Sequence, residues 1–282
     1  MVLDVLINPI EAEKRPWQMF FLGVLFSSMA ALLGTLIFVK YSSLVMVFLT
    51  VLASFPIIYN TIKLEEIKDE HAVSETRLLK EHSKAISAFM FLFLGILVAS
   101  TLWFVFLPSE QVNHLFSTQL DTITSINTQY TGNVVRPNVL STIFMNNLRV
   151  LSICLLFSFL YGVGAMFILT WNATVIAAAI GTFIRENLAS FGNLIGEVSI
   201  FKYFHIFSSG FFKYMFHGFF EILAYFVVAL AGGIISVAVI RHVFGSKKFE
   251  RIMFDVSELI IISVLLLFVA ALLEVYVTPV LF

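Results

Sequence analysis

Charged residues are scarce in this sequence. Asp, Glu, Lys and Arg make up 12% of its 282 residues, whereas a soluble domain needs about a quarter of its residues charged to cover its surface. The 17 basic and 18 acidic residues leave a net charge of −1, which gives no indication of a nucleic-acid partner. These deficits argue against a water-soluble domain and predict no nucleic-acid partner.

Cysteine is nearly absent, and the common catalytic motifs are missing as well. The single Cys154 lies in an apolar run and excludes an intrachain disulfide. The chain has no Walker A loop, no GxSxG, no GxGxxG after a strand, no CxxC and no carboxylate pair at catalytic spacing. We therefore predict neither an ATPase nor a serine hydrolase, and no cofactor.

Apolar residues, by contrast, account for 60% of the chain and recur in long runs. A membrane-spanning helix needs about 20 such residues to cross roughly 30 Å of hydrocarbon, and this many runs cannot share one soluble core. The predicted fold class is all-α, a polytopic α-helical membrane protein that crosses the cell membrane several times. Spanning helices are expected at 17–39, 43–59, 86–107, 147–170, 172–190, 214–241 and 256–280.

The polar segments between these runs predict the topology. Residues 60–85 are rich in Lys and Arg and indicate a cytoplasmic surface helix, or a continuation of the third membrane helix. The basic segment before the last run is likewise predicted to be cytoplasmic. Residues 108–142 are nearly uncharged and indicate an outer loop. Seven crossings then place the N-terminus inside and the C-terminus outside. Residues 191–213 are aromatic and fit either an interfacial segment or a re-entrant hairpin.

His217 and Glu221 are the most informative polar residues within an apolar run. Residues four apart share one helix face, and ionisable groups in a membrane are costly unless they are paired or hydrated. Imidazole and carboxylate also ligate zinc, but two ligands are too few and no HExxH motif completes them. We therefore predict no metal. A hydrogen-bonded His–Glu pair that fixes helix packing is the purely structural interpretation. An intramembrane metalloenzyme is a minor alternative that lacks a third ligand.

Further polar residues fall on the same, outer side in this topology. Arg149 and Glu221 are expected to pair, because a buried charge in lipid seeks an opposite one. Two interpretations stay open: a polar cavity open to the outer face that binds a headgroup, a glycan or a partner helix, or helix ends that simply carry polar residues. The candidate cluster comprises Asn146, Asn147, Arg149, Arg185, Glu186, His217, Glu221 and Glu274.

Small residues recur inside the predicted helices from 147 to 241. In lipid they permit close helix approach and mark packing seams; a hinge at Gly232-Gly233 is the less favoured alternative. They predict one compact core of these three helices, with the first three helices outside it. The glycines concerned are Gly162, Gly164, Gly181, Gly218, Gly232 and Gly233.

An ordered set of these residues resembles the stage II sporulation protein M family of integral membrane proteins. The set runs through Asn146-Asn147-x-Arg149, Gly162, Gly164, Asn172, Gly181, His217-Gly218-x-x-Glu221 and Gly232-Gly233. The resemblance covers residues 143–235, outside the first three helices. It implies that the polar members, Asn172 included, form one family site. Hydropathy and charge divide the rest of the chain into a transmembrane hairpin (1–59), a charged cytoplasmic helix (60–85) and a third helix with an outer loop (86–142), and the family-like core follows at 143–282.

The resemblance implies a membrane component that positions partners. In spore formers the family member acts during engulfment, in a complex with peptidoglycan-degrading proteins. The sequence thus favours a non-enzymatic scaffold for envelope remodelling, a homodimer in contact with membrane lipids and protein partners. The alternative is a small-molecule or lipid transporter that uses the seam of the helices between 147 and 241. That alternative requires polar residues through the depth of the membrane, whereas the expected midspans are nearly all apolar.

Overall fold

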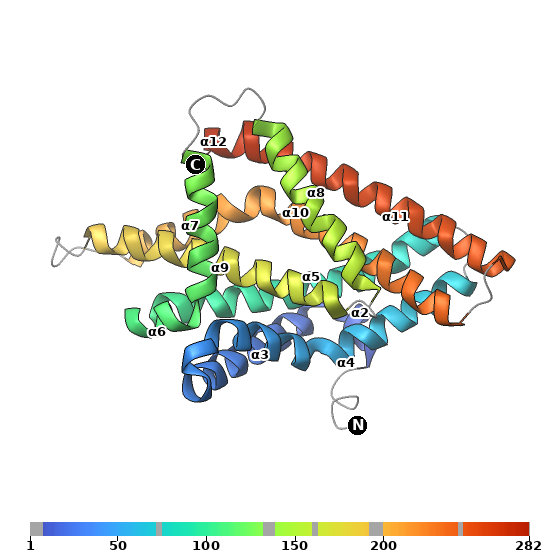
Figure 1. The fold of residues 1–282 in the computed structure, drawn as a ribbon, viewed down its shortest axis with the longest axis horizontal. Helices are drawn as coiled ribbons and strands as arrows, with labels where there is room; N and C mark the ends of the chain where they lie inside the picture. Colours follow the sequence, from blue (N-terminus) through green and yellow to red (C-terminus); the bar gives the residue numbers. More distant parts are fainter. Residues whose placement is uncertain are drawn as a thin grey trace.

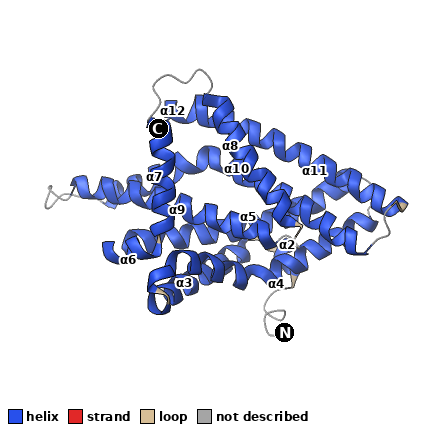
Figure 2. Cartoon of the chain, viewed as in Figure 1, coloured by secondary structure: helices blue, strands red, loops and turns tan. Residues whose placement is uncertain are grey.

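The computed structural model describes residues 8–71, 75–131, 139–159, 163–191, 200–241 and 245–281. These residues form helices and no strand (Figures 1 and 2), which confirms the predicted fold class. Seven helices in this part of the chain are long and apolar enough to cross a membrane. They are α3 (Trp17–Ile37), α4 (Ser42–His71), α5 (Glu75–Phe106), α8 (Val139–Ser158), α9 (Val163–Phe191), α10 (Ile200–Arg241) and α11 (Lys247–Leu272).

Short helical elements connect and extend these spans. The predicted outer loop at 108–142 contains two helices rather than irregular chain, because its Gln, Leu and Ser residues tolerate helical geometry and Pro108 precedes the first helical turn. The elements are α2 (Pro9–Lys14), η1 (Val39–Tyr41), α6 (Ser109–Leu115), α7 (Ser117–Thr131), the π-helical segment η2 (Leu273–Val277) and α12 (Thr278–Leu281).

Two further segments form helices that differ from the prediction. Residues 60–71 and 75–85 do not form a separate surface helix but continue α4 and α5, since their Glu, Lys and Leu residues are strong helix formers. Residues 200–213 are the first turns of α10 and form no re-entrant hairpin. The remainder of the ambiguous segment, 192–199, lies outside the described residues.

The boundary between α8 and α9 is the largest error of the sequence prediction. The expected break at residue 171 lies inside α9, and α8 already ends at Ser158. Hydropathy alone did not detect this boundary, because apolar residues flank it on both sides. As a result Asn172 lies in the interior of α9. Because α10 begins at Ile200, His217 likewise lies in the middle of a helix rather than at a helix start.

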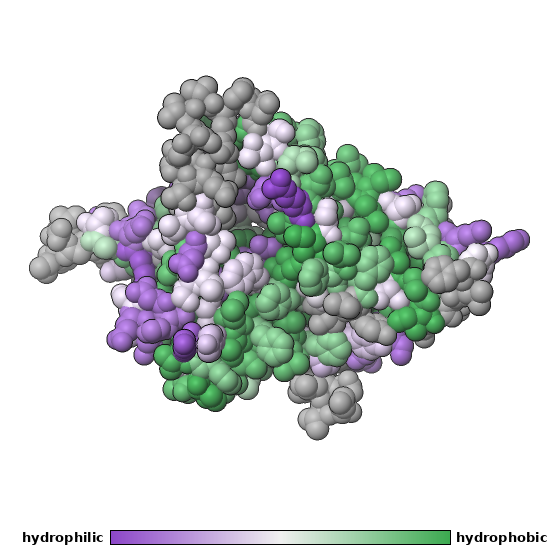
Figure 3. All heavy atoms as spheres, viewed as in Figure 1, coloured by the Kyte–Doolittle hydropathy of each residue, from purple (hydrophilic) through white to green (hydrophobic). Residues whose placement is uncertain are grey.

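The core is centred on α10. Tyr225 and Phe226 are fully buried there, and Phe89 and Phe93 of α5 pack on the Phe226 ring with centroid distances of 6.0 Å. The prediction that the first three helices lie outside the core is therefore wrong, at least for α5. By contrast α8 exposes large apolar side chains such as Leu156. Figure 3 shows apolar residues over the middle of the visible face and hydrophilic ones gathered toward its ends, as expected for a chain surrounded by lipid.

Several of the glycines lie at close helix contacts. A Cβ atom added to Gly164, Gly181, Gly232 or Gly233 would lie 2.6, 2.4, 1.7 or 2.9 Å, respectively, from its nearest neighbour. Gly218 has no atom within 4 Å of such a Cβ, so packing does not require a glycine at that position. Gly162 lies outside the described residues.

Candidate functional site

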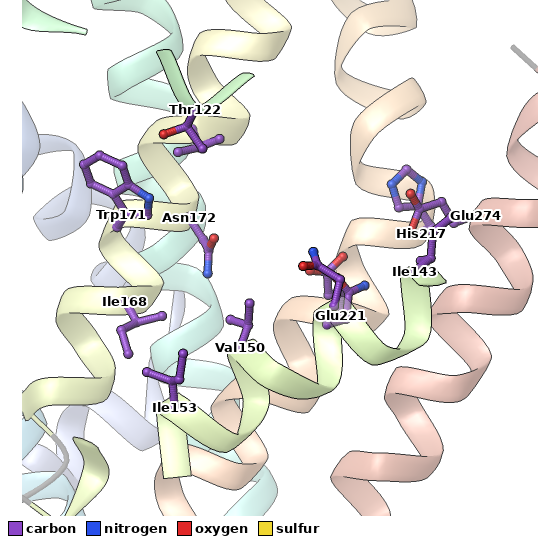
Figure 4. Close-up of a pocket in the computed structure, with 13 residues that line it drawn as sticks. Thr122, Ile143, Val150, Ile153, Ile168, Trp171, Asn172, His217, Glu221 and Glu274 are labelled. Carbon is purple, nitrogen blue, oxygen red and sulfur yellow. The ribbon is translucent and has the colours of Figure 1, made fainter. Parts of the chain in front are cut away.

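Six of the polar residues predicted from the sequence line one cavity of about 450 Å³. They come from α8, α9, α10 and η2, and Thr122 of α7 adds a further polar group (Figure 4). Aliphatic side chains such as Val150 and Ile168 form the apolar part of the wall. The six are Asn146, Asn147, Asn172, His217, Glu221 and Glu274.

Tyr225 holds the Glu221 side chain in place. Its buried hydroxyl donates a hydrogen bond of 2.8 Å to Glu221 Oε1 and lies 3.5 Å from the carbonyl oxygen of Asn147. These two residues are one helical turn apart on α10, so the helix itself supplies the partner of the carboxyl group. The contact with Asn147 also ties this point of α10 to α8.

Glu274 reaches the cavity from an irregular turn. It lies in η2, where the α11 helix widens to π geometry, a feature that is rare and often marks functional sites. The Thr278 hydroxyl donates to the Leu273 carbonyl oxygen at 3.1 Å, so its own oxygen accepts from His217 Nδ1 at 3.2 Å. This bond between α10 and the end of η2 orients the His217 ring. The other ring nitrogen, Nε2, remains as the second polar atom of the side chain.

Asn172 carries an unsatisfied donor. Its Nδ2 atom is buried, and it has no hydrogen-bond partner among the described residues. Buried side-chain donors are nearly always paired, and the exceptions call for an explanation such as a ligand. Figure 4 shows the Asn172 side chain on the wall opposite His217 and Glu221. A molecule in the cavity would therefore find donors and acceptors on both sides.

Three predicted residues do not line this cavity. Arg149 is exposed on α8, and the described part of the chain shows no ion pair between it and Glu221, whose partner is Tyr225. The predicted Arg149–Glu221 pair is therefore wrong, because α8 turns Arg149 away from α10. Glu186 is exposed and borders a second cavity of about 420 Å³ together with Lys213.

Arg185 has a structural role at the end of α5. Its guanidinium donates to the carbonyl oxygens of Leu107 and, at 3.4 Å, of Val105, and it lies 5.7 Å from the centre of the Phe104 ring. The last carbonyls of a helix have no partner within the helix, and a cation near them is favourable. Arg185 thus caps α5 and packs α9 against it.

The family assignment can now be compared with this geometry. The family model described as stage II sporulation protein M matches residues 85–279, more than half of the chain. The chain belongs to this family. The match begins at α5, so the third spanning helix, which the sequence resemblance left out, is part of the family region. The same comparisons found no match among curated proteins and none among solved structures.

A second polar cluster of this family member precedes the matched residues and was missed from the sequence. Lys68 Nζ lies 2.6 Å from Glu13 Oε2 and 2.5 Å from Glu65 Oε1, and His82 Nδ1 lies 2.6 Å from Glu65 Oε2. The charged sequence around His82 predicts a solvated surface histidine, but Glu65 is 0% and His82 1% exposed, so that prediction is wrong. We refer to Glu13, Glu65, Lys68 and His82 as the charge cluster.

The charge cluster joins α2 to α4 and α5. Its sequence signal was weak, because charged residues at 60–85 also suit an exposed helix face. The signal that finds it is the position of Glu65 and Lys68 on the same face of α4 as apolar residues such as Ile62, which is buried. Glu13 completes the cluster from a distant part of the chain, which a helical pattern cannot reveal.

Docking of α2 is predicted to weaken as the pH rises. Burial, with the neighbouring Glu65 carboxyl adding to it, raises the pKa of Glu13 from 4.5 to about 7. A raised pKa means that the folded state retains a proton that the unfolded chain releases, so this contribution to stability is complete below pH 4.5 and is lost as the pH rises through 7. Amide hydrogen-exchange protection factors in α2 should be higher at pH 6 than at pH 8.

Glu13→Gln is the matched variant for this prediction, since its uncharged amide imitates the protonated carboxyl group. It should keep the protection of α2 high and nearly equal at both pH values. The prediction is wrong if the native chain shows equal protection at pH 6 and pH 8, or if Glu13→Gln retains the full difference.

Proposed function

We propose that this multi-pass membrane protein binds a small solute in the cavity and carries it across the membrane without a chemical step. The observation that carries the proposal is the convergence of Asn147, Asn172, His217 and Glu221, each from the interior of a spanning helix, on one cavity. Its volume of about 450 Å³ is within the range of small-molecule sites, roughly 300–1,000 Å³. Ionisable residues at this depth are costly and mark solute pathways in membrane proteins.

The depth of these residues favours transport over the scaffold role. The sequence argued against a transporter because the expected midspans were apolar, and that argument rested on helix boundaries that placed Asn172 and His217 at helix ends. With α9 and α10 as observed, both residues lie within the spans. A scaffold that assembles envelope partners in the cell membrane has no need of an internal polar cavity. Irregular helical segments near a binding site, such as η2, are also typical of transporters.

Native mass spectrometry of the protein released from gentle detergent tests the binding step. We expect a small-molecule adduct on the native chain and its loss in Asn172→Leu, which removes the unpaired donor at similar volume. Asn113→Leu, the same exchange at an exposed position of α6, should keep the adduct. A native chain without an adduct, or an adduct that survives in Asn172→Leu, contradicts the proposal. The same spectra measure whether the chain is the homodimer that the sequence predicts.

Access from both sides of the membrane tests the transport step. Val150→Cys places a thiol on the cavity wall, whereas the native chain offers only Cys154, which is buried. A transporter exposes such a site alternately to each side. A membrane-impermeant thiol reagent should therefore modify Val150→Cys in right-side-out and in inverted vesicles. Modification from one side only would mean that the protein binds a solute but does not transport it.

A further inference from the structure

The cavity contains two acidic side chains and no Lys or Arg side chain to balance them. Glu221 and Glu274 both line it, and its described lining includes no Lys and no Arg. Tyr225 satisfies one oxygen of Glu221 with a neutral hydroxyl, which adds no charge. Because an ionised carboxylate inside a membrane is costly unless a cation accompanies it, these two carboxyl groups favour a positively charged ligand over a negatively charged one.

The remaining lining is unsuited to a metal ion and suited to an organic molecule. Among the described residues no group of three or more His, Cys, Asp or Glu side chains has the geometry to hold a metal. Instead the wall opposite the acids carries the Trp171 indole ring and aliphatic side chains such as Ile168 (Figure 4). Such aromatic and aliphatic walls bury the hydrocarbon part of a ligand.

From this arrangement we infer that the ligand is a small organic cation, an amine or quaternary ammonium compound that also carries a hydrogen-bond acceptor. Its ammonium group lies near Glu221 and Glu274, and its acceptor group takes the unpaired Nδ2 donor of Asn172. The hydrocarbon part packs against Trp171 and Ile168. The inference rests on the proposed function, since it assigns a substrate class to the same cavity.

Independent support comes from the backbone at Glu274. The α11 helix departs from regular geometry only where it meets the cavity, in η2, and the bond between His217 and Thr278 holds that irregular turn against α10. A regular α-helix would satisfy the backbone hydrogen bonds of these residues equally well, so backbone hydrogen bonding does not require the widening. A π turn at this point is therefore best explained by the position that it gives to the Glu274 side chain.

The test measures which charge the cavity admits, and it requires no knowledge of the natural ligand. Val150→Cys is treated at pH 8 with three methanethiosulfonates: the ethyltrimethylammonium cation, the ethylsulfonate anion and the neutral methyl compound. Ser109→Cys, at an exposed position of α6, corrects for the intrinsic reactivity of the reagents, and the native chain gives the background of buried Cys154. Ile168→Cys serves as a second reporter in case Val150→Cys does not fold.

We expect the corrected rate with the cation to exceed that with the anion by at least about tenfold, because two carboxylates act at short range in a medium of low dielectric constant. Adding Glu221→Gln and Glu274→Gln should reduce the ratio to that of Ser109→Cys. If the neutral reagent reacts but the charged reagents show no preference, the cationic ligand class is wrong and the solute site stands. If no reagent reaches either reporter in folded protein, the cavity is closed and the proposed function fails with it.

Discussion

Lys68→Met is expected to lower the free energy of unfolding by about 3 kcal/mol at pH 8. Lys68 provides the cation shared by Glu13 and Glu65, whose side chains are 6% and 0% exposed. Without it, two carboxyl groups stay buried next to each other with only His82 as a partner for Glu65. Removing one partner of a buried ion pair costs more than the pair contributes, because the remaining charge loses its compensation. Unfolding in mixed micelles, followed by circular dichroism, measures the loss.

The pH dependence of this loss identifies its cause. Since the pKa of Glu13 is already raised to about 7, acidification to pH 5.5 protonates this carboxyl group and removes part of the need for a cation. The cost of Lys68→Met should therefore be smaller at pH 5.5 than at pH 8. A loss of equal size at both pH values would show that Lys68 acts through packing of its aliphatic stem and not through its charge.

Lys84→Met is the matched control. Lys84 belongs to the same end of the bundle, but its side chain is 43% exposed and pairs at 2.7 Å with Glu81, whose side chain is 29% exposed. Exposed pairs of this kind contribute roughly 0–1 kcal/mol. Lys84→Met should thus leave the unfolding free energy nearly unchanged, and a loss comparable to that of Lys68→Met would contradict the importance of burial.

The fold was largely predictable from the sequence because hydrophobic run length is a direct consequence of membrane thickness. All seven predicted spans correspond to helices of the structure. Boundaries were less accurate wherever helices extend past the membrane, as at residues 60–71 of α4, or where apolar residues continue across a turn, as between α8 and α9. Hydropathy reports the solvent around a residue, whereas helix ends depend on local backbone geometry.

The sequence predicted which residues belong to the site better than it predicted how they are arranged. Six of the polar residues selected from the sequence line one cavity. A polar side chain within an apolar run is costly in a membrane and therefore usually has a specific role. Which of them meet depends on helix rotation: Arg149 lies only two residues from Asn147, yet it points outward. The partner role of Tyr225 and the π turn at Glu274 depend on tertiary contacts that a single sequence does not display.

Two glycines that the sequence analysis did not select lie directly against the backbone of a neighbouring spanning helix. A Cβ atom on Gly95 of α5 would lie 2.0 Å from the Phe20 carbonyl oxygen, and one on Gly23 of α3 would lie 2.3 Å from the Leu92 carbonyl oxygen. Both obstacles are backbone atoms, so a side-chain rotation cannot relieve the clash. In lipid, where burial of apolar surface does not drive helix association, such close packing is what holds α3 to α5.

Gly95→Ala is therefore expected to lower the unfolding free energy by about 2–3 kcal/mol, the upper part of the range for overpacking, since the added methyl group must separate two backbones. The same substitution at Gly218, where no atom lies within 4 Å of the new Cβ, should stabilise α10 by about 0.5–1 kcal/mol, because alanine loses less entropy than glycine in a helix. Unfolding in mixed micelles measures both variants under one condition. Stabilisation by both substitutions would mean that helix propensity, and not the contact between α3 and α5, governs this part of the protein.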